Sequence, residues 1–211
     1  MSKLNTFRLR RDIGSEEFDY VLLSGVLSSY SGPRQKIHQL LKTGIIRRVK
    51  KGLYVFGPEY NQVPVCAEVL ANQIYGPSCL SMESALSHYG LIPERVTVYT
   101  SVTPKKGRVF DTCLGRFAYQ HLALKSYPHG IEQVWLDESH PVLMASPEKA
   151  ICDYLSLRFQ GHLDNAESVR QFLVSDLRIS QHLWDRFSPD KLKSLNEHYQ
   201  SDNIRHLQET L

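Results

Sequence analysis

Ten side chains between residues 34 and 51 have the chemistry of a nucleic-acid contact. Lys and Arg pair with phosphate oxygens, and Gln can form a bidentate pair with adenine in a major groove. Residues 31–57 contain no Asp or Glu, so nothing in the segment cancels its positive charge. We predict that this segment binds duplex DNA through Arg34, Gln35, Lys36, His38, Gln39, Lys42, Arg47, Arg48, Lys50 and Lys51.

The residues that could support catalysis are scattered. Glu83, Asp111 and Asp153 are carboxylates of the kind that hold Mg²⁺ and activate water in a nuclease, but no Glu-x-Lys follows Asp111. The nine histidines and four cysteines form no HxxxH, CxxC or mixed cluster. Phosphate-binding glycine motifs and a G-x-S-x-G motif are also missing from the sequence. We therefore predict no catalytic residue, no metal site and no cofactor.

A helix followed by a hairpin must position the basic residues. Ser31 or Gly32 can cap the helix, Pro33 suits its first turn, and Gly44 can end it. The apolar stripe Ile37, Leu40 and Leu41 would face the core, which leaves Gln35, Gln39 and Lys42 on the opposite side. Arg34 would lie at the helix N-terminus, to one side of the stripe.

The hairpin is predicted from two β-branched and aromatic runs, "IIRRV" and "LYVF", which "KKG" joins. Residues 18–30 are apolar enough for a preceding helix, and "LNTFRLRRD" favours another. Helix, turn, helix and basic hairpin is the order of a winged helix-turn-helix, in which the second helix enters the major groove and the wing contacts the backbone. The alternative is a packing unit with a solvated basic face.

The rest of the chain alternates between helical and strand patterns. We expect strands over 94–102, 108–122, 130–137 and 141–145, and a helix over 146–159 that Ser146 caps. Helices are also expected near 65–76 and 81–89, and throughout the segment after residue 165. The predicted fold class is therefore α+β: an N-terminal winged helix-turn-helix, then a small mixed sheet with helices and a helical C-terminal tail.

Charge is distributed unevenly along the chain. Residues 1–57 contain 11 Lys and Arg against 4 Asp and Glu, whereas residues 58–211 contain 14 against 18. The proline-flanked segment 58–64 is typical of a linker. We therefore predict two domains: a DNA-binding domain at 1–57 and an α+β domain with a helical tail at 65–211. The start has no apolar run of signal-peptide length and no apolar run reaches membrane-span length, so we expect a cytoplasmic protein without a membrane partner.

Four stretches together carry a resemblance to a known family. "LLKTGIIRRVKKGLYVF", "SMESALSHYGLIPERVTVYTSV", "GRFAYQHL" and "ASPEKAICDYL" occur in that order. The sequence resembles, over roughly residues 15–157, the AbiEi-type antitoxins of bacterial type IV toxin–antitoxin systems. The resemblance implies an N-terminal winged helix-turn-helix that binds the operon's own promoter. It also implies a C-terminal domain that opposes a partner nucleotidyltransferase toxin, directly or indirectly.

The expected function is therefore repression of the chain's own promoter combined with neutralisation of a partner toxin. A two-fold operator would require a homodimer or two monomers side by side. Two other interpretations are a plain winged-helix transcriptional regulator whose C-terminal domain senses a ligand, and a nuclease. The family motifs themselves are expected to be determinants of the fold. The role of residues 158–211 is not predicted.

Overall fold

The computed structural model describes residues 6–159 and 161–211. Its fold is α+β, as expected, with helices and two sheets whose strand orders are β1-β3-β2 and β6-β7-β5-β4-β9-β8. Contacts divide the chain into an N-terminal unit, which runs to Ile74 and includes Thr112–Leu114, and a C-terminal unit, which comprises Tyr75–Asp111 and Gly115–Leu211. Residues 1–5 of the expected 1–57 domain lie outside the described residues. The contacts also group residues 65–74 with the N-terminal unit, whereas the sequence suggested a boundary at 58–64.

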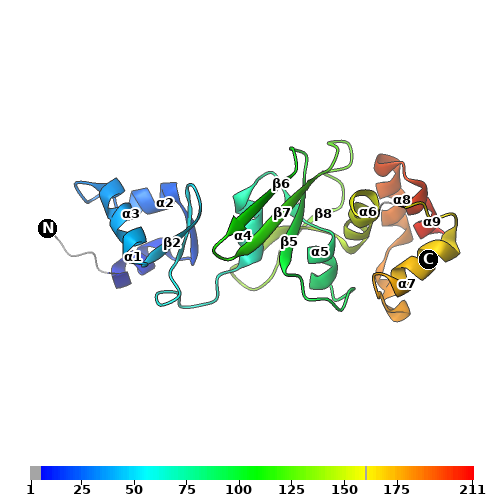
Figure 1. The fold of residues 1–211 in the computed structure, drawn as a ribbon, viewed down its shortest axis with the longest axis horizontal. Helices are drawn as coiled ribbons and strands as arrows, with labels where there is room; N and C mark the ends of the chain where they lie inside the picture. The colour runs from blue at the N-terminus through cyan, green and yellow to red at the C-terminus, as the bar shows by residue number, and fades with distance from the viewer. Residues whose placement is uncertain (1–5, 160) are drawn as a thin grey trace. The chain divides into compact units, whose positions relative to one another are not determined.

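The N-terminal unit combines short helices with a three-stranded antiparallel sheet (Figure 1). Its elements are α1 (Thr6–Ile13), β1 (Glu17–Asp19), α2 (Tyr20–Val26), α3 (Pro33–Lys42), β2 (Ile46–Lys50), β3 (Leu53–Phe56) and α4 (Ala67–Ile74). Its buried core draws on every element from α1 to β3, with Leu9, Phe18, Leu23, Leu40 and Phe56 among its members. Helix α3 is therefore held by its apolar stripe.

The expected helix over residues 18–30 is shorter than predicted. Residues Glu17–Asp19 form strand β1, which pairs with β3 so that Phe18 lies opposite Tyr54. Asp19 then accepts a hydrogen bond from the backbone N–H of Leu22 at 2.8 Å and so begins α2. The prediction of a helix from residue 18 was wrong because Phe18 packs across the sheet, on Tyr54 and Phe56, and Asp19 caps the helix instead.

The C-terminal unit is built on the six-stranded mixed sheet. Its elements are β4 (Cys79–Leu80), α5 (Glu83–His88), β5 (Val98–Thr103), β6 (Arg108–Thr112), β7 (Gly115–His121), β8 (Ile131–Trp135), β9 (Pro141–Ala145), α6 (Pro147–Leu157), α7 (Ala166–Ser175), the 3₁₀ helix Gln181–Arg186, α8 (Pro189–Tyr199) and α9 (Asp202–Gln208). Strands β5 and β7 are parallel, as are β4 and β9, whereas β4 pairs antiparallel with β5 and β8 with β9, so the sheet is mixed as expected.

Two differences from the expected strands have local causes. The segment 108–122 forms two strands, β6 and β7, because the chain turns at residues 113–114 and Gly115 adopts a φ of +120°. Strand β4 has only two residues, too few for any periodic pattern to reveal it.

The segment after residue 160 belongs to the C-terminal unit. Helix α8 packs on α6 and on α9, and α9 packs in turn on α6 and α7, so these helices lie together (Figure 1). Ser146 caps α6 as predicted, its hydroxyl accepting from the N–H of Lys149 at 3.2 Å. Among the described residues, no helix has the length and apolar character needed to cross a membrane.

Candidate nucleic-acid interface

Helix α3 presents one apolar and one polar face. Ile37 and Leu40 are buried, whereas Arg34, Gln35, His38, Gln39 and Lys42 are exposed and Lys36 is half-buried. The polar face of α3 therefore consists of the residues that the sequence analysis predicted to contact DNA. Their exposure agrees with the predicted helix geometry, and their contact with DNA stays a prediction.

Both ends of α3 are fixed by local chemistry. Gly32 is the N-cap, Pro33 opens the helix, and the hydroxyl of Thr43 donates to the carbonyl of Gln39 at 2.9 Å. Gly44 follows with a φ of +72°, the left-handed conformation that glycine adopts without steric cost. The helix therefore ends where the sequence placed its end, and the exposed face has a defined length.

Side chains on this face also interact with one another. The ammonium of Lys36 lies 3.4 Å from the side-chain oxygen of Gln39 and 5.3 Å from the ring centroid of Tyr30. The amide nitrogen of Gln39 keeps two N–H donors, which a base edge or phosphate could accept. Lys36 thus orients Gln39 while its own charge adds to the positive face.

A shallow hollow of about 580 Å³ lies where α2 meets the beginning of α3. It is lined by Tyr20, Ser24, Ser28, Gly32, Pro33, Arg34 and Gln35. Tyr20 and Ser24 of α2, and Ser28 just beyond its end, were missed in the sequence interpretation. Their spacing of four, which brings side chains onto one helical face, is the signal that could have found them.

The four wing cations differ in their surroundings. Arg48 and Lys51 are exposed, Arg47 is half-buried, and the guanidinium of Arg48 lies 5.9 Å from the ring centroid of Tyr54. The ammonium of Lys50 donates to the carbonyl of Ile74, the last residue of α4, at 2.5 Å. A lysine at a helix C-terminus satisfies a carbonyl that lacks an intrahelical partner and opposes the negative end of the helix dipole.

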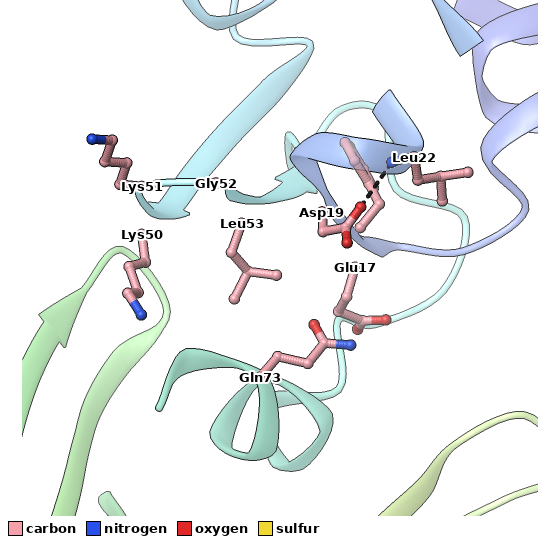
Figure 2. A pocket seen from close by; sticks show the side chains of 9 residues that line it. Glu17, Asp19, Leu22, Lys50, Lys51, Gly52, Leu53 and Gln73 are labelled. Atoms are coloured by element: carbon pink, nitrogen blue, oxygen red, sulfur yellow. Dashed lines mark hydrogen bonds between the residues drawn. The ribbon is translucent and has the colours of Figure 1, made fainter. Parts of the chain in front are cut away.

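The hollow beside the wing has charges of both signs. It has a volume of about 510 Å³ and is lined by Glu17, Phe18, Asp19, Leu22, Lys50, Lys51, Gly52, Leu53 and Gln73. Figure 2 shows Lys51 extending away from the hollow, whereas Lys50 extends toward the helix that carries Gln73. Two carboxylates in this wall make it unsuited to phosphate, whereas the outward-pointing Lys51 and the exposed Arg48 are free of that repulsion.

The four acidic residues within 1–57 all have structural partners. Asp12 pairs with Arg8 at 3.4 Å and with Arg11 at 3.1 Å, and Asp19 caps α2. Glu17 accepts a hydrogen bond from the backbone N–H of Cys66. Glu16 is buried and binds Arg10. Burial raises the pKa of its carboxyl, but the hydrogen bonds from Arg10 and from the N–H groups of residues 62 and 63 together outweigh burial, so the pKa lies below its usual value. None of these carboxylates lies on α3, so the charge of its exposed face is not cancelled from within the helix.

The carboxylates considered for a nuclease each have a separate cation. Asp111 pairs with Arg116 at 2.7 Å and Glu83 with Arg158 at 3.2 Å. Asp153 is fully buried beside Lys149. Within residues 6–159 and 161–211, no group of three His, Cys, Asp or Glu side chains is arranged to hold a metal ion.

No protein-family model matches the chain, and no curated protein matches it as a relative.

Proposed function

We propose that the N-terminal unit is a winged helix-turn-helix that binds duplex DNA, with α3 in the major groove and the β2–β3 wing on the phosphate backbone. The observation that carries this proposal is the exposed face of α3, which has cations and amides and no carboxylate. Support also comes from the order α1-β1-α2-α3-β2-β3 and the antiparallel sheet order β1-β3-β2, which match the connectivity expected of this motif.

Within this proposal the residues have two kinds of task. Gln35 and Gln39 read base edges, and His38 lies between them on the exposed face. Arg34, Lys36 and Lys42 along α3 and Arg48 and Lys51 on the wing bind phosphates. Arg47 and Lys50 belong to the same basic strand, but the hydrogen bond of Lys50 to Ile74 gives that residue a structural task first.

We further propose, from the resemblance to the AbiEi-type antitoxins, that the chain represses its own promoter and counteracts a partner nucleotidyltransferase toxin. The two most specific motifs of the resemblance lie on the adjacent helices α5 and α6. Glu83 of the first motif pairs with Arg158, and Asp153 of the second binds Ser81. The motifs therefore organise the interior of the C-terminal unit, which supports a role as determinants of the fold that presents the antitoxin surface.

If this proposal is right, mutations can separate recognition of bases from binding of phosphates. Gln39→Ala is expected to lose about 1–3 kcal/mol of binding free energy on promoter DNA and little on random DNA. The double variant Arg48→Ala/Lys51→Ala should weaken binding to both, with the log–log salt slope falling by about 0.9 for each phosphate that the variant no longer binds. Fluorescence anisotropy with the two duplexes at several salt concentrations measures both effects.

The matched control is Arg95→Ala/Lys193→Ala, which removes the same charge from exposed positions of the C-terminal unit. If the control and the wing variant lost equal affinity, the wing would have no specific part in binding. If Gln39→Ala lost equal affinity for promoter and random DNA, Gln39 would not recognise a base. The antitoxin proposal is tested separately, by growth of cells that co-express the chain and the neighbouring toxin gene.

A further inference from the structure

A second group of cations lies on the C-terminal unit, in the loop between β5 and β6 and at the start of β6. Lys105, Lys106 and Arg108 are all exposed, and residues 104–110 contain no acidic side chain. The nearest carboxylate in sequence, Asp111, is already paired with Arg116. No ion pair involves the three cations within the described part of the chain.

Two of these cations converge on one aromatic ring. The ammonium of Lys105 and the guanidinium of Arg108 each lie 5.6 Å from the ring centroid of Tyr75. The negative face of the ring partly offsets their charge, but two cations brought to one ring still repel each other. An anion that binds between them would remove that repulsion, so the arrangement favours a negatively charged ligand.

The loop that carries these residues is held in place before any ligand arrives. The hydroxyl of Tyr75 donates to the carbonyl of Lys106 at 3.1 Å, and the ammonium of Lys105 donates to the carbonyl of Gly76 at 2.6 Å. The imidazole of His121 lies 3.0 Å from the carbonyl of Lys105, to which its Nδ1–H donates. Little conformational entropy is therefore lost when the loop binds.

The ring itself is fixed by its aromatic neighbours. Tyr75 lies with its centroid 5.7 Å from that of Phe110 and 5.3 Å from that of Tyr119. Phe110 and Tyr119 also contact each other at 5.7 Å, in an edge-to-face arrangement. This three-ring cluster is the rigid support beneath Lys105 and Arg108.

We propose that Lys105, Lys106 and Arg108 form a second nucleic-acid contact, on the C-terminal unit, that binds backbone phosphates without reading sequence. Lysine is depleted in the cores of protein–protein interfaces, whereas Lys and Arg supply most contacts to phosphate. Pairing of these three cations with backbone phosphates is the same on every DNA sequence, so the proposed contact adds affinity without selecting a sequence. This inference goes beyond the proposed function, because it does not depend on α3 or the wing binding DNA.

The test uses the full chain in which Arg34, Gln39, Lys42, Arg48 and Lys51 are changed to Ala. We expect this background variant still to bind a labelled 20-base-pair random duplex at low salt. Adding Lys105→Ala, Lys106→Ala and Arg108→Ala should reduce that binding and lower the log–log salt slope by about 0.9 for each phosphate no longer bound. Because Lys105 also holds Gly76, the double variant Lys106→Ala/Arg108→Ala is measured beside the triple.

A matched triple, Arg95→Ala/Lys125→Ala/Lys193→Ala, removes the same charge from dispersed exposed positions and should leave the slope nearly unchanged. Equal effects of the two triples would reduce the result to net charge and overturn the proposal. Unchanged DNA binding in the Lys105 triple, with loss of binding to polyglutamate, would point to an acidic protein instead and would also overturn it. Wild-type affinity in the background variant would contradict DNA binding by α3 and the wing. This outcome differs from those that overturn the second contact, so failure of one proposal can be told from failure of the other.

Discussion

At the scale of single residues, the most constrained group is a buried ion pair in the C-terminal unit. Lys149 and Asp153 have fully buried side chains, and the ammonium lies 3.4 Å from the carboxylate. Asp153 also accepts from the hydroxyls of Ser81 and Tyr199, and Lys149 lies 2.9 Å from the Tyr199 oxygen. Burial raises the pKa of Asp153, although Lys149 and the two hydroxyls act in the opposite direction.

Lys149→Met is expected to destabilise the protein by about 3–5 kcal/mol near pH 7, because it leaves a buried carboxylate without its cation. A carboxyl whose folded-state pKa is raised contributes stability that is present below its unfolded pKa and is lost as pH rises through its folded pKa. The deficit should therefore shrink as pH falls from 7 toward 4. This loss of stability is measured by chemical denaturation at several pH values, with the wild type and the exposed variant Lys193→Met as controls. A loss that does not depend on pH would contradict the role of the buried Asp153 carboxylate.

At the scale of elements, the hairpin depends on close approach between two glycines. The N–H of Gly57, just after β3, donates to the carbonyl of Ile45 at 2.9 Å. A Cβ at Gly57 would lie 2.0 Å from the carbonyl oxygen of Gly44, which ends α3 with a φ of +72°. Glycine at position 57 therefore allows the end of β3 to approach the turn between α3 and β2.

Gly57→Ala is expected to lower the free energy of unfolding by about 3 kcal/mol or more, because the backbone must shift to admit the methyl group. The control is Gly25→Ala in α2, where the added Cβ meets no atom within 4 Å and φ is not positive. That substitution should be neutral or stabilise by up to about 1 kcal/mol. Thermal and urea unfolding of both variants give the comparison, and a Gly57→Ala protein as stable as Gly25→Ala would refute the steric argument.

At the scale of the whole molecule, the C-terminal tail is a structural part of the C-terminal unit. Tyr199 of α8 joins the core cluster that contains Cys79, Met82 and Val102, and it reaches the Lys149–Asp153 pair. The N–H of Ser188 also donates to the buried carboxylate of Glu148 at 3.0 Å. Residues after 160 thus add a hydroxyl partner to the Lys149–Asp153 pair of α6 and supply a hydrogen-bond donor to its buried Glu148.

A chain that ends at residue 159 is therefore expected to lose cooperative folding of the C-terminal unit and to be poorly soluble, because it exposes that core and removes Tyr199. The full chain with Tyr199→Phe should stay folded but lose about 1–3 kcal/mol, since only one hydroxyl partner of Asp153 and Lys149 is removed. Soluble yield and calorimetric melting measure both effects. A truncated chain that melts cooperatively at the wild-type temperature would show the tail to be dispensable.

The sequence by itself determined the features that local chemistry controls. Helix α3, a cap at Ser31 or Gly32, its end before Gly44 and its buried Ile37 and Leu40 all follow from periodicity and from the conformational preferences of Gly and Pro, and the structure places the cap at Gly32. The α+β class and the Ser146 cap of α6 were predicted on the same grounds. The exposed residues of α3 could also be predicted, because the buried stripe of a helix determines which residues lie on its opposite face.

Only the tertiary structure decided the features that join distant residues. Strand β1 exists because Glu17–Asp19 pair with β3, and the sheet order β6-β7-β5-β4-β9-β8 depends on pairings that no local pattern specifies. The hydrogen bond of Lys50 to Ile74, the convergence of Lys105 and Arg108 on Tyr75, and the union of Tyr199 with Lys149 each cross many residues of chain. Periodicity reports which side of an element is buried, but the partner that buries it is set by the packing of the whole chain.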